Sequence, residues 1–129
     1  MNLILFRKPI TTLAKLFAFF LFLNLSSSTV LAQAEKGEKL FKSYCASCHK
    51  PTAQALVGPG LAGVTEKYDK EWLYKWIKNS GALIASGDER AIATYEENGK
   101  VAMPAQPVNN EEIDAILDYI AEYKEVSAG

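Results

Sequence analysis

Residues that could bind a metal or act as nucleophiles are scarce in this chain of 129 residues, which has two cysteines, one histidine and two methionines. A structural zinc site needs four cysteine or histidine ligands, so three residues of these types are too few. The chain has no surplus of basic residues, since its formal net charge is −1, and this excludes a general affinity for nucleic acid. Alternation of apolar and polar residues over the length of a strand is also absent, which excludes a β-sheet protein.

A long hydrophobic run is missing as well, because the longest one, residues 16–25, has ten residues, nine of them apolar. A membrane-spanning helix needs about 20. Three basic residues and no acidic residue precede this run, and small residues follow it. The pattern predicts a secretory signal peptide, residues 1–32, cleaved after Ala32 or alternatively after Ala34. The mature domain would then be residues 33–129, exported to the periplasm; the alternative is an uncleaved leader that acts as a membrane anchor.

Apolar residues spaced three or four positions apart predict an all-α domain. The stripe of the first helix ends at Cys45 and consists of Ala34, Gly37, Phe41 and Tyr44. Later stripes consist of Trp72, Leu73, Trp76 and Ile77, and of Ile113, Ile116, Leu117 and Ile120. Loops rich in glycine and proline, residues 51–68 and 100–108, separate the helices. Four short helices with such long loops enclose little core, so we expect a large apolar ligand at the centre of the domain.

Residues with capping side chains predict where two of these helices begin. Asp69 precedes the second stripe and Asn109 precedes the last one, and both residue types favour the N-cap position. Glu111 and Glu112 follow Asn109, where acidic groups interact favourably with the positive end of the helix. Gly81 is the predicted end of the second helix.

A further helix is predicted between these two. Ser86 and Glu89 have the spacing of a capping box, which predicts a helix start at Ser86. The same pattern predicts that the side chains of Ile92 and Tyr95 lie on the buried face of this helix. Gly99 would end this helix, because glycine adopts the left-handed conformation that often terminates helices.

Both cysteines and the histidine lie in one pentapeptide, Cys45-Ala46-Ser47-Cys48-His49. This is the C-x-x-C-H attachment pattern of c-type haem. Thioethers from Cys45 and Cys48 would hold the porphyrin, and His49 would be the proximal iron ligand. A thioredoxin-like dithiol would follow a strand, whereas this motif follows a predicted helix, and a simple disulfide would leave His49 without a role. The sequence therefore predicts one covalently bound haem c.

A sixth iron ligand can be found by elimination. Met1 is lost with the leader and no second histidine exists, so Met103 is the remaining candidate. It lies in the loop Gly99–Pro104, and Pro104 restricts the preceding residue to extended conformations. The alternative reading of Met103 is flexible core filler. We predict His49 and Met103 as the axial ligands.

With these residues in place, the sequence resembles the class I monohaem cytochromes c. The resemblance extends over residues 34–124 and is carried by Cys45–His49, the segment Gly58-Pro59-Gly60-Leu61 and Met103-Pro104. It implies the cytochrome c fold, four short helices and long loops around the haem. It further implies that the Pro59 carbonyl accepts a hydrogen bond from Nδ1–H of His49, which orients the ring and raises its basicity as a ligand.

The resemblance also implies a close crossing of the first and last helices. Gly37 and Phe41 would meet Ile116 and Tyr119 there. The stretch Gly81–Gly99 departs from mitochondrial cytochrome c and looks like the extra helical insert of some bacterial relatives.

Two tryptophans remain open to a second role. Trp72 and Trp76 are candidates for binding the haem propionates through their indole N–H groups. Packing in the core is the alternative for both, and the one that their positions on an apolar helix stripe favour.

We expect a periplasmic one-electron carrier and not an enzyme, because two axial ligands leave no iron position for a substrate. The expected partners are respiratory donor and acceptor proteins, and no nucleic acid. We expect membrane contact only through these partners or through an uncleaved leader. We also expect a monomer. One alternative is a haem subunit tethered to a membrane respiratory complex. The other is a haem peroxidase or gas-binding protein, which requires that Met103 does not bind iron.

Charge is unevenly distributed along the expected mature chain. Residues 33–78 carry a net charge of +3, whereas residues 79–129 carry −7. If the lysines of the first part surround the exposed haem edge, they would steer the protein towards an acidic partner. These lysines are Lys36, Lys39, Lys42, Lys50, Lys67, Lys70, Lys75 and Lys78.

Overall fold

The structure is a computed structural model that describes residue 33 and residues 35–123. The expected signal peptide, its cleavage after Ala32 and the alternative site after Ala34 lie outside the described residues. Within the described residues, no helix is long and apolar enough to cross a membrane.

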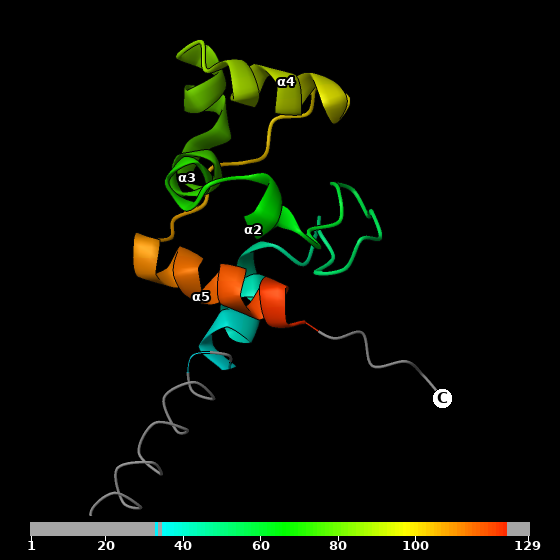
Figure 1. Cartoon of the computed structure of the whole chain (residues 1–129), viewed down its shortest axis with the longest axis vertical. Coiled ribbons are helices and arrows are strands. Elements are labelled where there is room, and N and C mark those ends of the chain that lie inside the picture. The colour runs from blue at the N-terminus through cyan, green and yellow to red at the C-terminus, as the bar shows by residue number, and fades with distance from the viewer. Residues whose placement is uncertain (1–32, 34, 124–129) are drawn as a thin grey trace, which may run out of the picture. The chain divides into compact units, whose positions relative to one another are not determined.

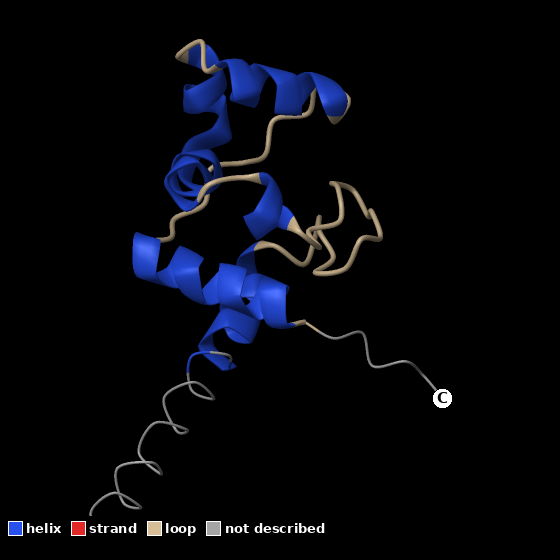
Figure 2. Ribbon diagram, viewed as in Figure 1, coloured by secondary structure: helices blue, strands red, loops and turns tan. Residues whose placement is uncertain are grey.

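The described part of the chain consists of helices and loops, without any strand (Figure 2). Residues 35–44 are helical and are followed by α2 (Val64–Lys67) and α3 (Lys70–Ala85). The last two helices are α4 (Glu89–Glu97) and α5 (Asn110–Glu122) (Figure 1). The prediction of an all-α domain of short helices and long loops is confirmed, and the four-residue helix α2 lies within a predicted loop.

Two of the predicted helix starts are confirmed. The Asp69 carboxylate accepts a hydrogen bond from the Trp72 N–H at 3.3 Å and caps α3. Asn109 caps α5 and forms a complete capping box, in which its side chain accepts from the Glu112 N–H and Glu112 accepts from the Asn109 N–H, both at 2.9 Å. These caps satisfy N–H groups that a helix leaves unpaired in its first turn.

The predicted end of the second helix at Gly81 is wrong. Helix α3 continues to Ala85, but Asn79 leaves helical geometry with φ −163° and ψ 85°. The Asn79 side chain accepts a hydrogen bond from the Ala82 N–H at 2.9 Å, which restarts the helix as an N-cap would. A local break followed by a new cap therefore replaces the expected termination.

The predicted start of the next helix at Ser86 is also wrong. Asp88 caps α4 by accepting a hydrogen bond from the Ala91 N–H at 2.8 Å, whereas the Ser86 hydroxyl donates to the Leu83 carbonyl at 2.7 Å. Ala91 is fully buried and Ile92 is 40% exposed, so the inward orientation expected for Ile92 is wrong as well. Packing of α4 on α3 decides which of its faces is buried, and the capping pattern carries no information on that contact.

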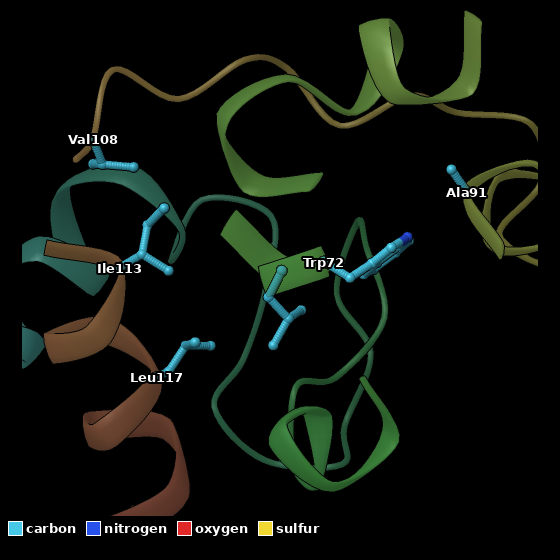
Figure 3. Packing of buried hydrophobic residues seen from close by; sticks show 6 residues of the cluster. Trp72, Ala91, Val108, Ile113 and Leu117 are labelled. Atoms are coloured by element: carbon cyan, nitrogen blue, oxygen red, sulfur yellow. The ribbon is translucent and has the colours of Figure 1, made fainter. Parts of the chain in front are cut away.

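The core consists of two small clusters that share α5. One contains buried residues from α3, α4, α5 and the loop before α5, namely Trp72, Leu73, Ala91, Val108, Ile113 and Leu117 (Figure 3). The other joins the segment 35–44 to α5 through Phe41, Ile116 and Ile120. Only ten apolar residues of the described part are buried, which agrees with the thin core expected from the sequence.

The crossing between the segment 35–44 and α5 has the predicted residues. A Cβ atom added to Gly37 would lie 2.0 Å from the Ala115 carbonyl oxygen and 2.9 Å from Cβ of Tyr119. The rings of Phe41 and Tyr119 pack with their centroids 5.4 Å apart. Glycine at position 37 therefore allows the two backbones to approach, as the resemblance implied.

Candidate functional site

The pentapeptide Cys45–His49 forms a turn directly after the first helical segment. The N–H groups of Cys45 and Ala46 donate to the Phe41 carbonyl, at 2.8 and 2.9 Å. The N–H groups of Cys48 and His49 donate in turn to the Cys45 carbonyl, at 3.1 and 2.9 Å. The turn thus continues the helix, and it brings both thiols and the imidazole to one helix end.

Both cysteines are half-buried and neither forms a disulfide. Burial raises the pKa of the Cys45 thiol to about 11, so this thiol is protonated at neutral pH. Redox-active dithiols have a thiol with a lowered pKa, and Cys45 has the opposite shift. The raised pKa of the Cys45 thiol therefore argues against the thioredoxin-like alternative.

The orientation of the His49 ring is set by the segment that begins at Gly58. His49 Nδ1 lies 2.8 Å from the Pro59 carbonyl oxygen, which can only accept, so Nδ1–H donates to it and Nε2 is the ring nitrogen left for another partner. Backbone hydrogen bonds from Gly58 N–H to the Cys48 carbonyl (2.8 Å) and from Leu61 N–H to the Lys50 carbonyl (3.0 Å) hold this segment against the motif. A neutral imidazole with a free Nε2 is the form that binds a metal ion.

At two positions of this segment, a side chain larger than that of glycine would clash with neighbouring atoms. A Cβ atom at Gly58 would lie 2.4 Å from Cε1 of His49, and one at Gly60 would lie 2.4 Å from the Thr52 carbonyl oxygen. The Gly-Pro-Gly pattern was evident in the sequence, but the steric need for its glycines was not predicted from it. The signal was available in the sequence, because glycines flank Pro59 on both sides and the resemblance already placed Pro59 against His49.

Met103 lies in the loop between α4 and α5 and is half-buried. The turn into this loop is made as predicted by Gly99, which has φ +72°, followed by Lys100 with φ +61°. The Met103 carbonyl accepts a hydrogen bond from the hydroxyl of Ser80 at 2.7 Å. Ser80 was not predicted as a site residue, although the sequence offers a signal: a serine three residues after Ile77 continues an otherwise apolar stripe of α3.

The two tryptophans of α3 belong to an aromatic stack. Trp72 stacks on Tyr68 and on Trp76, with centroid distances of 4.7 and 5.1 Å. Its indole N–H donates to the Asp88 carboxylate at 3.1 Å. Because an indole has a single N–H donor, the propionate role considered for Trp72 is wrong, and core packing describes it. Trp76 is half-buried and stays a candidate for binding a haem propionate.

Several of the lysines that were expected to form a positive patch are paired with acidic groups. Lys42 contacts Glu38 at 2.7 Å. Lys67 contacts Glu97 at 3.6 Å and Lys70 contacts Asp114 at 2.8 Å, and both of these pairs join the basic part of the sequence to the acidic part. The separation of charge along the sequence is therefore partly cancelled in space.

The site fits a covalently held haem and does not fit a metal cage made by the protein alone. Among the described residues, no group of three or more histidine, cysteine, aspartate or glutamate side chains is placed to hold a metal ion. Two thiols that can form thioethers with the porphyrin and an imidazole that can bind its iron, placed together at one helix end, are the groups that hold c-type haem. The loops that follow the motif and precede α5 also carry exposed apolar side chains, Leu56, Val57 and Val101, suited to contact with a porphyrin.

Comparison with known proteins agrees with this geometry. The family model for cytochrome c matches residues 34–124. Cytochrome c-551 of Bacillus subtilis is 32% identical over 62 residues, which are 48% of this chain and 55% of that protein. The chain thus spans about half the length of the curated relative it matches.

Solved structures give the same result. Cytochrome c from Rhodothermus marinus is 28% identical and superposes with a TM-score of 0.60 over 70% of this chain and 75% of that one. An engineered form of the Rhodothermus marinus protein gives a TM-score of 0.59 at 27% identity, over 70% and 76% of the two chains.

Proposed function

Because the chain belongs to the cytochrome c family, we propose that it is a one-electron carrier whose haem c is attached through Cys45 and Cys48 and whose iron is bound by His49 and Met103. The observation that carries this proposal is the His49 ring, which is bound through Nδ1 to Pro59 at 2.8 Å at the end of a helix with two unpaired thiols. Haem iron, when bound, supplies the reversible change between ferric and ferrous states that moves one electron.

The residues around the site favour electron transfer over catalysis. His49 is the only histidine of the chain; with Nδ1–H bonded to Pro59 and Nε2 on the iron, it would have no ring nitrogen left to act as a general base. Met103 would bind the iron through its thioether and so exclude a substrate from it. The soft thioether would stabilise the ferrous form and raise the reduction potential.

We propose further that the protein works outside the cytoplasm and exchanges electrons with respiratory proteins. The leader pattern in residues 1–32 supports export, and covalent haem attachment through C-x-x-C-H is consistent with it. Determining the mature N-terminus by mass spectrometry tests this point. An N-terminus after residue 32 and a mass that includes haem support a cleaved carrier, whereas an intact leader would favour the membrane-tethered alternative.

The Met103→Ala variant tests the ligand assignment. We expect it to keep covalent haem, to lose the weak far-red absorption band of methionine-bound ferric haem, and to bind carbon monoxide readily in the ferrous state. Ile92→Ala is the control, because it shortens an exposed apolar side chain of α4 that is not part of the proposed site. If the unchanged protein binds carbon monoxide as fast as Met103→Ala, Met103 is not a ligand and the gas-binding or peroxidase alternative replaces the carrier.

A further inference from the structure

Ser80 is the one buried polar residue of the described chain, with an exposed fraction of 0%. A serine within a helix usually bonds to a carbonyl of the preceding turn of its own helix. The Ser80 hydroxyl instead donates to the Met103 carbonyl, 23 residues away in sequence, at 2.7 Å. A buried polar group bonded to another segment acts as a specific link between the two.

The break in α3 lies beside this link. Asn79 is extended, and its side chain caps the Ala82 N–H, so Ser80 falls in the first turn of the restarted helix. Before the break, the Ile77 carbonyl accepts a hydrogen bond from the Gln106 N–H at 3.3 Å. The loop that contains Met103 is therefore bonded to α3 on both sides of the break.

These two links are the loop's own connections to the helices. Among the described residues, no other hydrogen bond joins residues 101–108 to the rest of the chain. The remaining bonds, from the Gln106 side chain to the Pro104 carbonyl and from the Val108 N–H to the Gln106 carbonyl, lie within the loop. Ser80 makes the one bond to Met103 itself.

We propose that Ser80 is a positioning residue for the sixth iron ligand, which acts by fixing the Met103 backbone. This inference rests on the proposed function, because it requires that Met103 binds the iron. A methionine side chain has three rotatable bonds, so its sulfur is held in one place only if its backbone is held. Pro104 limits the conformation of Met103, and the Ser80 hydroxyl fixes the position of its carbonyl.

The test compares Ser80→Ala with Ser86→Ala in the ferric holoprotein. Both changes remove a serine hydroxyl that donates to a backbone carbonyl at 2.7 Å, but the Ser86 bond stays within its own helical stretch, at Leu83. At saturating imidazole, the binding rate reports how often Met103 leaves the iron. We expect Ser80→Ala to raise this rate about tenfold, in line with the loss of one buried hydrogen bond, and to weaken the far-red methionine band. Ser86→Ala should change neither.

A second variant separates the hydroxyl from the volume of the side chain and serves if Ser80→Ala does not fold. Ser80→Thr keeps the hydroxyl, and we expect it to keep the far-red band. The proposal is overturned if Ser80→Ala binds imidazole at the rate of Ser86→Ala, or if Ser80→Thr loses the band completely. In either case, a far-red band in the unchanged protein would still support Met103 as an iron ligand. If the unchanged protein lacks the band and binds carbon monoxide as fast as Met103→Ala, the proposed function and this inference both fail.

Discussion

Gly37 lies against Ala115 so closely that a methyl group at position 37 would come 2.0 Å from the Ala115 carbonyl oxygen. The contact is to backbone, which has no rotamer that could move aside. Phe41, one turn further along, packs its ring against Tyr119 and is buried with Ile116. The motif Cys45–His49 follows this crossing directly, so the crossing anchors the segment that carries the proposed haem ligand.

Gly37→Ala should therefore destabilise the protein although alanine favours helix formation. We expect the free energy of unfolding to fall by about 1–3 kcal/mol, the usual cost of overpacking a filled contact. Gly81→Ala is the control, since its Cβ would meet only the Asn79 side chain at 3.6 Å, and this change should be neutral or stabilise by up to about 1 kcal/mol. Denaturant titration of both variants decides the matter, and equal stabilities would disprove the close approach.

Gly58→Ala should disturb the iron ligand without touching the thiols. Its Cβ would lie 2.4 Å from Cε1 of His49, so the ring or the segment with Pro59 must shift. We expect covalent haem to be retained and the proton NMR signals of the His49 ring in the ferric protein to move. Pro59→Ala keeps the carbonyl that accepts from His49 and should leave these signals nearly unchanged. Identical shifts in the two variants would contradict the role given to Gly58.

Asp88 should make stability depend on pH in the acid range. The Trp72 indole N–H, and after it the Ala91 N–H, hold the pKa of the Asp88 carboxyl below its ordinary value of 3.8. Because the folded-state pKa is the lower one, this stabilisation is complete above the unfolded-state pKa and is lost as the pH falls through the folded-state pKa. Asp88→Asn keeps an acceptor oxygen but does not titrate, so its stability should fall less steeply below about pH 4.

The measurement is denaturant unfolding between neutral pH and the acid range. Asp118→Asn, which removes an exposed carboxylate on α5, is the control and should follow the unchanged protein. An Asp88→Asn profile parallel to that of the unchanged protein would show that the Trp72–Asp88 bond does not couple to protonation.

Electron transfer with an acidic partner should depend modestly on salt. Three of the eight lysines expected to form the positive patch are paired with carboxylates, which reduces the field that the patch produces. Rates should decrease as ionic strength rises, most steeply where the Debye length shrinks towards about 10 Å. Glu97→Gln, which leaves Lys67 without its carboxylate, should raise the rate at low salt.

Glu122→Gln removes the same charge at the end of α5 and is the matched control. A position-specific patch predicts a larger effect for Glu97→Gln. Equal effects of the two variants would show that only the net charge matters, and a rate that rises with ionic strength would exclude attraction to an acidic partner.

Features that depend on neighbouring residues could be predicted from the sequence. The apolar stripes identify the helices, and the caps at Asp69 and Asn109 form as predicted because a capping side chain reaches N–H groups only two or three residues away. The Cys45–His49 motif is equally local, and the hydrogen bonds of one helical turn bring its thiols and imidazole together. The crossing at Gly37 was inferred from family resemblance, because nothing local identifies its partner.

Features that depend on packing between distant segments were decided by the tertiary structure. Ser86 had the better capping pattern, but Asp88 caps α4 because the Trp72 indole from α3 holds its carboxylate at 3.1 Å. The Ser80–Met103 bond joins residues 23 apart in sequence; the serine stands out in an apolar stripe, but nothing in the sequence identifies Met103 as its partner. Sequence periodicity identified the buried faces of α3 and α5 but not that of α4. The partner of a buried polar group depends on which segments meet there, and only the folded chain determines that.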